Sequence, residues 1–324
     1  MRVTTAGQTQ SIISRLQQGA QRLAEAQRRV TTGLRVEKLS DDPTAGARVM
    51  EAAAGIRATA QYARNADRIA AQLDAEDSAL QQVADLVGRA KELAAGALSV
   101  TNSAAGRAAS ALEVGELLRQ TLDTANQVVG GEYLFGGLNA DGRPPFDPAA
   151  PGFVFTDPAP DDNDPLTPPL PPVPRYPTGT RVVEAGPAEQ RLAGAHDGTT
   201  IFLARDASGA PDPTRGLLPA LAALQAALAA NDVPGVDAAM RTLDTAFDGV
   251  QAHVGELGTR QARVDLARAG FAGATEQLTR EKSELGEVDA EQAITEMVAR
   301  QTAYQAAMLA SSRVMGLSLA DYLR

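Results

Sequence analysis

The chain has 324 residues, of which 44% are hydrophobic but only 4% aromatic, and its formal net charge is −10 at pH 7. The acidic balance argues against a nucleic-acid partner, and the absence of cysteine excludes disulfides, thiolate metal ligands and cysteine nucleophiles. Because His196 and His253 are the only histidines, multi-histidine metal sites are excluded too, and we expect no metal, no cofactor and no catalytic centre. No apolar run approaches the roughly 18 residues of a membrane span, which predicts no membrane insertion.

The first 40 residues are basic, with seven Lys or Arg against two Glu, and they lack the apolar core of a secretory signal. Apolar residues recur there at spacings of three and four, which predicts an amphipathic helix. Its stripe consists of Ile13, Leu16, Ala20, Leu23, Val30 and Leu34. A stripe this narrow makes the helix marginal alone in water, so residues 1–42 are expected to need a partner. The same composition is also typical of an organellar transit peptide.

A helix start is predicted at Asp42-Pro43. Aspartate is a preferred N-cap, and proline is favoured at the first helical position. Capping explains this acidic pair, Asp41 and Asp42, better than acid–base or metal chemistry, because no histidine lies nearby. Apolar residues with helical spacing continue over 69–97 and are broken by Glu76, and a second helix is predicted from about Arg107.

Glycines surround two aromatic residues where the second helix is expected to end. The flexible corner between the helices and the next segment is predicted at Tyr133, Phe135, Gly136 and Gly137. No Lys-Ser or Lys-Thr follows, so the pattern of a phosphate-binding loop is not met. Packing of the corner and contact with another subunit are both open explanations for the two aromatic rings.

Seventeen of the nineteen prolines lie between residues 144 and 219, which confines long helices to the two flanks. Three short runs have the residue types of strands: Phe153–Phe155, Arg181–Glu184 and Thr199–Arg205. They predict a small, variable β-rich insertion over 141–215. His196-Asp197 offers a base and an orienting carboxylate without a nucleophile motif, and we interpret it as a surface turn before Gly198.

The second flank carries a strict repeat, because every seventh residue over 243–285 is apolar. This period is typical of a long helix in a coiled coil. The simplest topology folds the two flanks, 43–140 and 216–285, into a long antiparallel coiled-coil rod. The predicted fold class is therefore mainly α with a β-rich insertion, with both chain ends together and the insertion at the far end.

The last segment, 286–324, repeats the pattern of the first, with five acidic residues against three Arg. Its apolar stripe consists of Ile294, Val298, Met308, Met315, Leu319 and Tyr322. Opposite charge and matching stripes predict that the two ends pair with each other and with copies from neighbouring chains. The plain alternative is that they only complete a bundle within one chain.

Three parts of the sequence resemble the flagellin superfamily. The first consists of Met1–Thr5, Thr32–Val36 and Ser40–Ala45. The second, Gly130–Gly137 closed by Pro145-Phe146, resembles the turn into the variable domain of the hook–filament junction branch of this superfamily. The third, Leu317–Leu323, is similar to the C-terminus of that branch rather than to filament flagellin. The resemblance covers about 1–146 and 235–324.

The resemblance implies a structural protein of the bacterial flagellum with no catalytic step. Family termini are disordered in the free subunit and fold into concentric helical coiled coils on assembly. The junction branch forms a homo-oligomeric ring that contacts the first hook-associated protein on one side and flagellin on the other. The family is exported by the type III apparatus without signal cleavage, while a chaperone holds the C-terminal helix, and its members are extracellular. The basic N-terminus is then an export signal.

Two rivals remain at this point. One is a filament-forming flagellin from the same superfamily, against which the corner and the C-terminal ending argue. The other is a cytosolic coiled-coil scaffold whose ends bind a partner helix. No combination of nucleophile, base and oxyanion donor is visible that would favour an enzyme.

Overall fold

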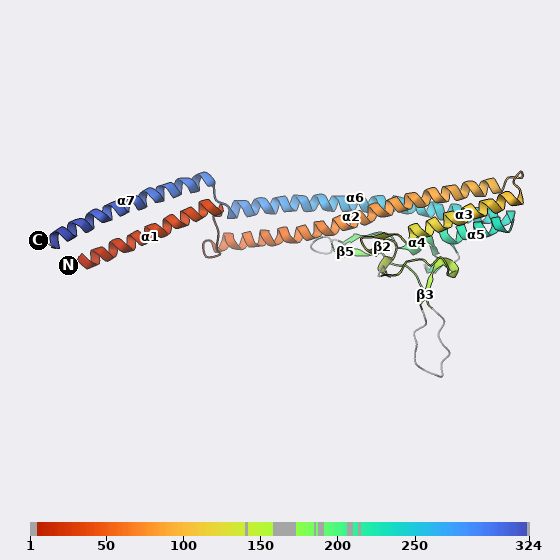
Figure 1. Cartoon of the computed structure of the whole chain (residues 1–324), viewed down its shortest axis with the longest axis horizontal. Helices are drawn as coiled ribbons and strands as arrows, with labels where there is room; N and C mark the ends of the chain where they lie inside the picture. Colours follow the sequence, from red (N-terminus) through yellow and green to blue (C-terminus); the bar gives the residue numbers. More distant parts are fainter. Residues whose placement is uncertain are drawn as a thin grey trace, which may run out of the picture. The chain divides into compact units, whose positions relative to one another are not determined.

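The computed structural model describes residues 5–139, 142–157, 173–184, 186, 191–205, 210–212 and 215–322, with the backbone alone over 5–9, 139, 151, 156–157, 173–175, 211 and 314–322. The chain divides into two compact units, which are described separately. The terminal unit comprises Met1–Ala60 and Gly273–Arg324, and the central unit comprises Gln61–Ala272. Helices dominate both units, and strands are confined to a small region, which confirms the predicted mainly helical class (Figure 1).

The helices follow the chain in an order close to the predicted one. They are α1 (Thr5–Thr32), α2 (Pro43–Ala97), α3 (Ala104–Ala125), α4 (Gly198–Phe202), α5 (Leu217–Ala229), α6 (Val233–Gly286) and α7 (Ala290–Tyr322). Helix α3 starts slightly before the predicted Arg107 because Ser103 caps it, accepting a hydrogen bond from the Gly106 amide at 3.1 Å. Among the described helices, none combines the length and the apolar character that crossing a bilayer would require.

In the central unit, α2 and α6 run antiparallel in one constant register. Three polar pairs mark it: Lys91–Asp244 at 2.6 Å, Asp74–Gln261 at 3.4 Å and Asp67–Arg268 at 2.8 Å. From one pair to the next, the residue number on α2 falls by the same amount as the residue number on α6 rises. The packing therefore contains no slip between the first pair and the last.

The seven-residue repeat of α6 faces the core of this unit. Its first five members are buried: Leu243, Val250, Leu257, Val264 and Phe271. Partner side chains on α2 include Ile69, Leu73, Leu80, Val83 and Val87, all at most 1% exposed. Helices α3 and α5 pack on each other, and their buried side chains join the same hydrophobic cluster. Burial of these aliphatic side chains, at roughly 1.5–3 kcal/mol each, is the main stabilising contribution.

Four antiparallel pairs of strands are found among the described residues of the strand-containing region. They are β1–β2 (Val128–Val129 with Glu132–Tyr133), β3–β4 (Phe155–Asp157 with Val173–Arg175), β5–β6 (Val182–Glu184 with Arg191–Ala193) and β7–β8 (Ala204–Arg205 with Pro211–Asp212). Each strand has only two or three residues. Pairs this short are not stable alone. Leu192 of β6 is buried in the hydrophobic cluster that also contains the helices, and Val129 and Val183 pack against it.

The predicted strand at Thr199–Arg205 is wrong for most of its length. Helix α4 occupies Gly198–Phe202, and only Ala204–Arg205 forms a strand. The reason is local, because the carboxylate of Asp197 caps the helix by accepting a hydrogen bond from the Thr200 amide at 2.9 Å. The predicted run at Phe153 also begins late, since Phe153 lies in a short 3-10 turn with φ +62° and the strand starts at Phe155.

A tight hairpin leads into the predicted corner. Gly130 and Gly131 have φ values of +63° and +87°, the left-handed conformation that a two-residue turn between β1 and β2 requires. Phe135 is completely buried, with its ring centroid 5.1 Å from that of Phe202 in an edge-to-face contact. Packing therefore explains Phe135, whereas Tyr133 is half-buried.

The strand-containing region is joined to the helices by hydrogen bonds at its base. The side chain of Asn126, at the end of α3, donates to the carbonyl of Phe146 and accepts from its amide, both at 2.9 Å. The amide of Gly198 donates to the carbonyl of Phe135 at 2.9 Å. A Cβ at Gly198 would lie 2.7 Å from the ring of Phe146, so only glycine permits this close approach.

Replacing Val264 with Asp tests the packing of α6. The side chain is 2% exposed, and an unpaired carboxylate there would lose its hydration as well as the buried apolar contacts. We expect Val264→Asp to lower the free energy of unfolding by about 3 kcal/mol or more. Leu266→Asp is the matched control, since Leu266 is 75% exposed on the same helix. Equal stability of the two variants in denaturant titrations followed by far-UV circular dichroism would contradict the packing described.

Candidate functional site

In the terminal unit, α1 and α7 lie side by side (Figure 1). Small residues allow the close approach, since a Cβ added to Gly19 would lie 3.2 Å from the ring of Tyr304. Ala26 and Ala293 are each 5% exposed. An ion pair between Arg29 and Glu296, at 3.8 Å, is exposed and adds little to the stability of the pair.

A short backbone ladder closes the base of this helix pair. Gly33, with φ +68°, ends α1, and its carbonyl accepts a hydrogen bond from the Val288 amide at 2.9 Å. The Arg35 amide donates to the Gly286 carbonyl at 2.7 Å, and its guanidinium donates to the Leu285 carbonyl at 2.6 Å. The motif Thr32–Val36 thus holds the connection between α6 and α7.

Asp42 and Pro43 form the start of α2. The Asp42 carboxylate accepts a hydrogen bond from the Ala45 amide at 3.0 Å and faces the Arg35 guanidinium at 3.3 Å. The hydrogen bond from Ala45 and the nearby Arg35 lower the pKa of Asp42. Helix α2 begins at Pro43, whose missing amide proton costs nothing at that position.

About half of the surface of the apolar stripe predicted on α7 stays exposed beside α1. Ile294, Val298 and Met308 are 49%, 52% and 51% exposed, and Leu309, which the stripe does not include, is 66% exposed. We call these four residues the exposed α7 face. The buried Ala293 directly precedes Ile294, so Ile294 points about 100° further round the helix, away from the covered side.

The other predicted interface residues differ from one another in exposure. On α1 and just after it, Ile13 and Leu34 are 38% and 37% exposed. Leu16, Leu23 and Val30 are half-buried. The side chains of Met315, Leu319 and Tyr322 lie outside the residues whose side chains are described. Sequence reasoning missed Gly19 and Tyr304 as contact residues, although a glycine inside an amphipathic helix is a signal of close packing.

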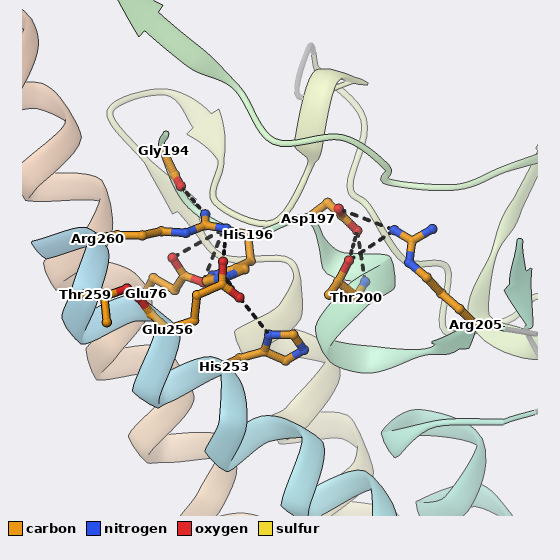
Figure 2. A network of polar contacts seen from close by, with 10 residues as sticks. All are labelled: Glu76, Gly194, His196, Asp197, Thr200, Arg205, His253, Glu256, Thr259 and Arg260. Atoms are coloured by element: carbon orange, nitrogen blue, oxygen red, sulfur yellow. Dashed lines mark hydrogen bonds and ion pairs between the residues drawn. The ribbon is translucent and has the colours of Figure 1, made fainter. Parts of the chain in front are cut away.

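The central unit contains a buried polar network (Figure 2). Glu76 of α2 is completely buried, and its carboxylate Oε1 lies 2.6 Å from Nδ1 of His196. The His196 backbone amide donates to the same carboxylate at 3.2 and 3.3 Å. His196 and Asp197 are 3% and 6% exposed, so the prediction of a surface turn there is wrong. The buried Glu76 supplies the partner that makes burial of the imidazole possible.

Helix α6 closes the other side of the network. Oε2 of Glu256 lies 3.3 Å from Nε2 of His196 and 4.0 Å from Nδ1 of His253. Arg260 donates to Oε1 of Glu256 at 2.7 Å and to the Gly194 carbonyl at 2.8 Å. The ring centroids of His196 and His253 are 5.2 Å apart, so the fold brings together the two histidines that composition alone treats as too few for a metal site.

The network shifts the protonation of its members in opposite directions. Burial opposes a charged His196, but the hydrogen bond and charge of Glu76 outweigh it and raise the pKa of His196. Burial and the neighbouring His196 lower the pKa of His253. The hydrogen bond from Arg260 lowers the pKa of Glu256 against the opposing effect of burial, and the charge of His196 acts in the same direction.

The two flanks of the chain each match a known protein family. Residues 3–140 match the bacterial flagellin N-terminal helical region, and residues 240–323 match the bacterial flagellin C-terminal helical region. Flagellar hook-associated protein 3 of Salmonella typhimurium is 25% identical over 308 residues, which are 90% of this chain and 89% of that protein. The protein of the same name from Escherichia coli is 26% identical over 308 residues, with the same two shares.

Solved structures share the fold. A putative flagellar hook-associated protein from Vibrio parahaemolyticus aligns with a TM-score of 0.60 and 17% identity, over 76% of this chain and all of that one. FlgL of Xanthomonas campestris aligns with a TM-score of 0.55 and 16% identity, over 70% of this chain and 98% of that one. At these identities the likeness concerns the fold alone.

Glu76 tests the buried network. Glu76→Ala would leave His196 buried without its carboxylate, and we expect it to lower the free energy of unfolding by about 3 kcal/mol. Glu76→Gln keeps a hydrogen-bonding group and should cost less. The exposed Asp85→Asn on the same helix is the control. Stability of Glu76→Ala equal to that of the control in denaturant titrations would contradict a stabilising role for the pair.

The pH dependence of unfolding, measured with a chelator present, tests the same pair. The raised pKa of His196 means that its contribution is complete below the unfolded pKa of about 6.5 and is lost as pH rises through the folded value. The lowered pKa values of His253 and Glu256 act only at more acidic pH, and Glu76 and Arg260 complete the surrounding charges. We expect wild-type stability to fall above about pH 6.5, and Glu76→Gln to flatten that fall. An identical slope in both proteins would contradict it.

Proposed function

We infer that this chain, which belongs to the flagellin superfamily, is a structural hook-associated component of the bacterial flagellum. The two curated relatives named above span nine tenths of the chain, including the residues between the two flagellin regions. Both carry the name of a hook-associated protein and not of a filament flagellin, which favours this role over the first rival. Their names also disfavour a cytosolic scaffold.

We propose that the chain joins hook to filament by packing its end helices against neighbouring subunits. The observation that carries this proposal is the exposed α7 face. Ile294, Val298 and Met308 leave about half of their surface in water although α1 already covers another side of the helix. An aliphatic stripe left open beside an existing helix pair is the pattern expected of a surface that a further helix covers.

The estimated free energies favour addition of a subunit to an existing assembly over the formation of dimers in solution. Covering the exposed half of four such side chains would contribute roughly 1 kcal/mol each, or about 4 kcal/mol per copy. Association of two proteins costs an estimated 4–15 kcal/mol in lost translational and rotational freedom. One such contact therefore cannot hold two copies together, whereas a subunit added to a preformed ring gains contacts with several neighbours at once.

The proposed assembly has defined partners and a defined location. The assembled form is a homo-oligomeric ring outside the cell, at the junction of hook and filament, with the first hook-associated protein on one side and flagellin on the other. An export chaperone holds the C-terminal helix beforehand, and no signal peptide is cleaved. The exposed α7 face supports the chaperone step, since it is available before assembly. We assign the chain no catalytic step and no enzyme activity.

A charge on the exposed α7 face tests the assembly role. Val298→Asp should leave the chain folded but prevent it from joining hook to filament, because an aspartate cannot be buried unpaired against a helix of the chaperone or of a neighbouring subunit. Ala303→Asp is the matched control, since Ala303 is exposed on α7 but points away from this face. The measurement is swimming motility and electron microscopy of junctions in cells whose own copy is deleted. Normal junctions with Val298→Asp would overturn the proposal.

Protection from protease tests whether the end helices are complete in one copy. In a dilute solution of the isolated chain, we expect cleavage within α1 and α7 well before cleavage of the central unit, because isolated helices with half-exposed stripes are marginal in water. Mass spectrometry of the fragments over time gives the order. Protection of both end helices equal to that of the central unit would show that they need no neighbour.

A further inference from the structure

We propose that His196, His253 and Glu256 form a binding site for one divalent transition-metal ion of the zinc class. The ligand atoms of the three residues all lie within 4.8 Å of one another. They come from two separate parts of the central unit, the loop before α4 and one turn of α6 (Figure 2). The site is independent of the end helices and of their role in assembly.

His196 supplies the strongest observation. Its Nε2 atom is buried and has no hydrogen-bond partner, although the side chain is only 4% exposed. A buried polar atom without a hydrogen bond costs free energy unless a nearby charge compensates it. Nε2 points toward Glu256 in Figure 2, at 3.3 Å from Oε2. A cation between these two atoms would satisfy both.

The spacing already suits tetrahedral coordination. Zinc binds histidine nitrogen and carboxylate oxygen at about 2.0–2.2 Å, so two ligands of a tetrahedral ion lie about 3.4 Å apart. The separation of 3.3 Å between His196 and Glu256 matches this edge. Nδ1 of His253, 4.0 Å from the same oxygen, needs only a small rotation of its half-buried side chain.

Each histidine is also held in the way that metal ligands require. Glu76 lies against Nδ1 of His196, and with the proton on Nδ1 the lone pair of Nε2 is available to a cation. A hydrogen bond with the backbone of Thr200 orients the ring of His253. A carboxylate or carbonyl behind a histidine is the usual outer partner of a metal-binding imidazole. Glu76 is thus a positioning residue in this proposal.

The donor set selects the class of ion. Two imidazole nitrogens and one carboxylate suit zinc and its neighbours in the first transition row, whereas calcium and magnesium prefer oxygen alone. Three protein ligands leave a fourth position for water. Glu256 is 51% exposed, which gives the ion a route from solvent, and Arg260 holds its other oxygen in place.

Zinc binding to this chain can be assigned readily, because the chain has only two histidines and no cysteine that could bind zinc elsewhere. The full chain, without a histidine tag and stripped with a chelator, is titrated with zinc chloride by calorimetry and by thermal unfolding. We expect one equivalent to bind and to raise the melting temperature. Magnesium and calcium chloride should give no shift. Cobalt(II) in place of zinc should give the intense visible absorption of a tetrahedral site.

Variants assign the ligands. His253→Ala and Glu256→Gln should each bind zinc at least tenfold more weakly, while Glu281→Gln, exposed on the same helix, should bind as the wild type does. Glu76→Gln should weaken binding by about 10–100-fold through the outer partner. Circular dichroism of each metal-free variant separates these losses from unfolding. Zinc binding that is absent, exceeds one equivalent without saturation, or is unchanged in His253→Ala and Glu256→Gln would overturn the proposal.

Discussion

The constant antiparallel register of α2 and α6 is the constraint on which the central unit depends. Hydrophobic burial is not directional, and a shift by one heptad would bury nearly as much apolar surface. The polar pairs set the register, from Lys91–Asp244 to Asp67–Arg268. In this register Glu76 lies across from the turn of α6 that carries Glu256 and Arg260, and the loop bearing His196 is held between them. A slip would leave that buried carboxylate without a counterpart, which penalises alternative alignments far more than the loss of a few methyl contacts does.

The end helices pack on each other in a different way from α2 and α6. The repeat on α6 buries large aliphatic side chains over many turns, whereas the contact between α1 and α7 is made by Gly19, Ala26 and Ala293 with one aromatic ring. Small residues allow close backbone approach but remove little surface from water, so this pair gains less per turn. The larger apolar side chains of α7, Ile294 and Val298, are left outside it. The terminal unit therefore leaves four apolar side chains of one helix face exposed: Ile294, Val298, Met308 and Leu309.

Local periodicity predicted the helices because each one repeats its pattern over many turns, and proline confined them correctly to the flanks. The repeat over 243–285 and the cap at Asp42-Pro43 fall where α6 and α2 lie. Contacts between distant residues could not be predicted in this way. His196 is buried because of a partner 120 residues earlier, and the only sign of it in the sequence is Glu76 interrupting an otherwise apolar stripe. Helix α4 escaped prediction because its threonines favour strands, and the Asp197 cap outweighs that preference. On α7 the stripe was visible, but neighbouring residues such as Ala293 and Ile294 are both apolar, and the pattern does not show which of them α1 covers.

The hydrogen bonds at the base of the strand-containing region bear on how this chain tolerates change. Hydrogen bonds with Asn126 hold Phe146, and the carbonyl of Phe135 holds the amide of Gly198 at the start of α4, so two points within the segment are fixed in place. The entropy of closing a loop grows only slowly with its length, by about 0.6 kcal/mol for each doubling. Insertions at exposed positions between those two points, such as Ala149, should consequently perturb the helices little, and a foreign peptide could be displayed there without disturbing the helical packing.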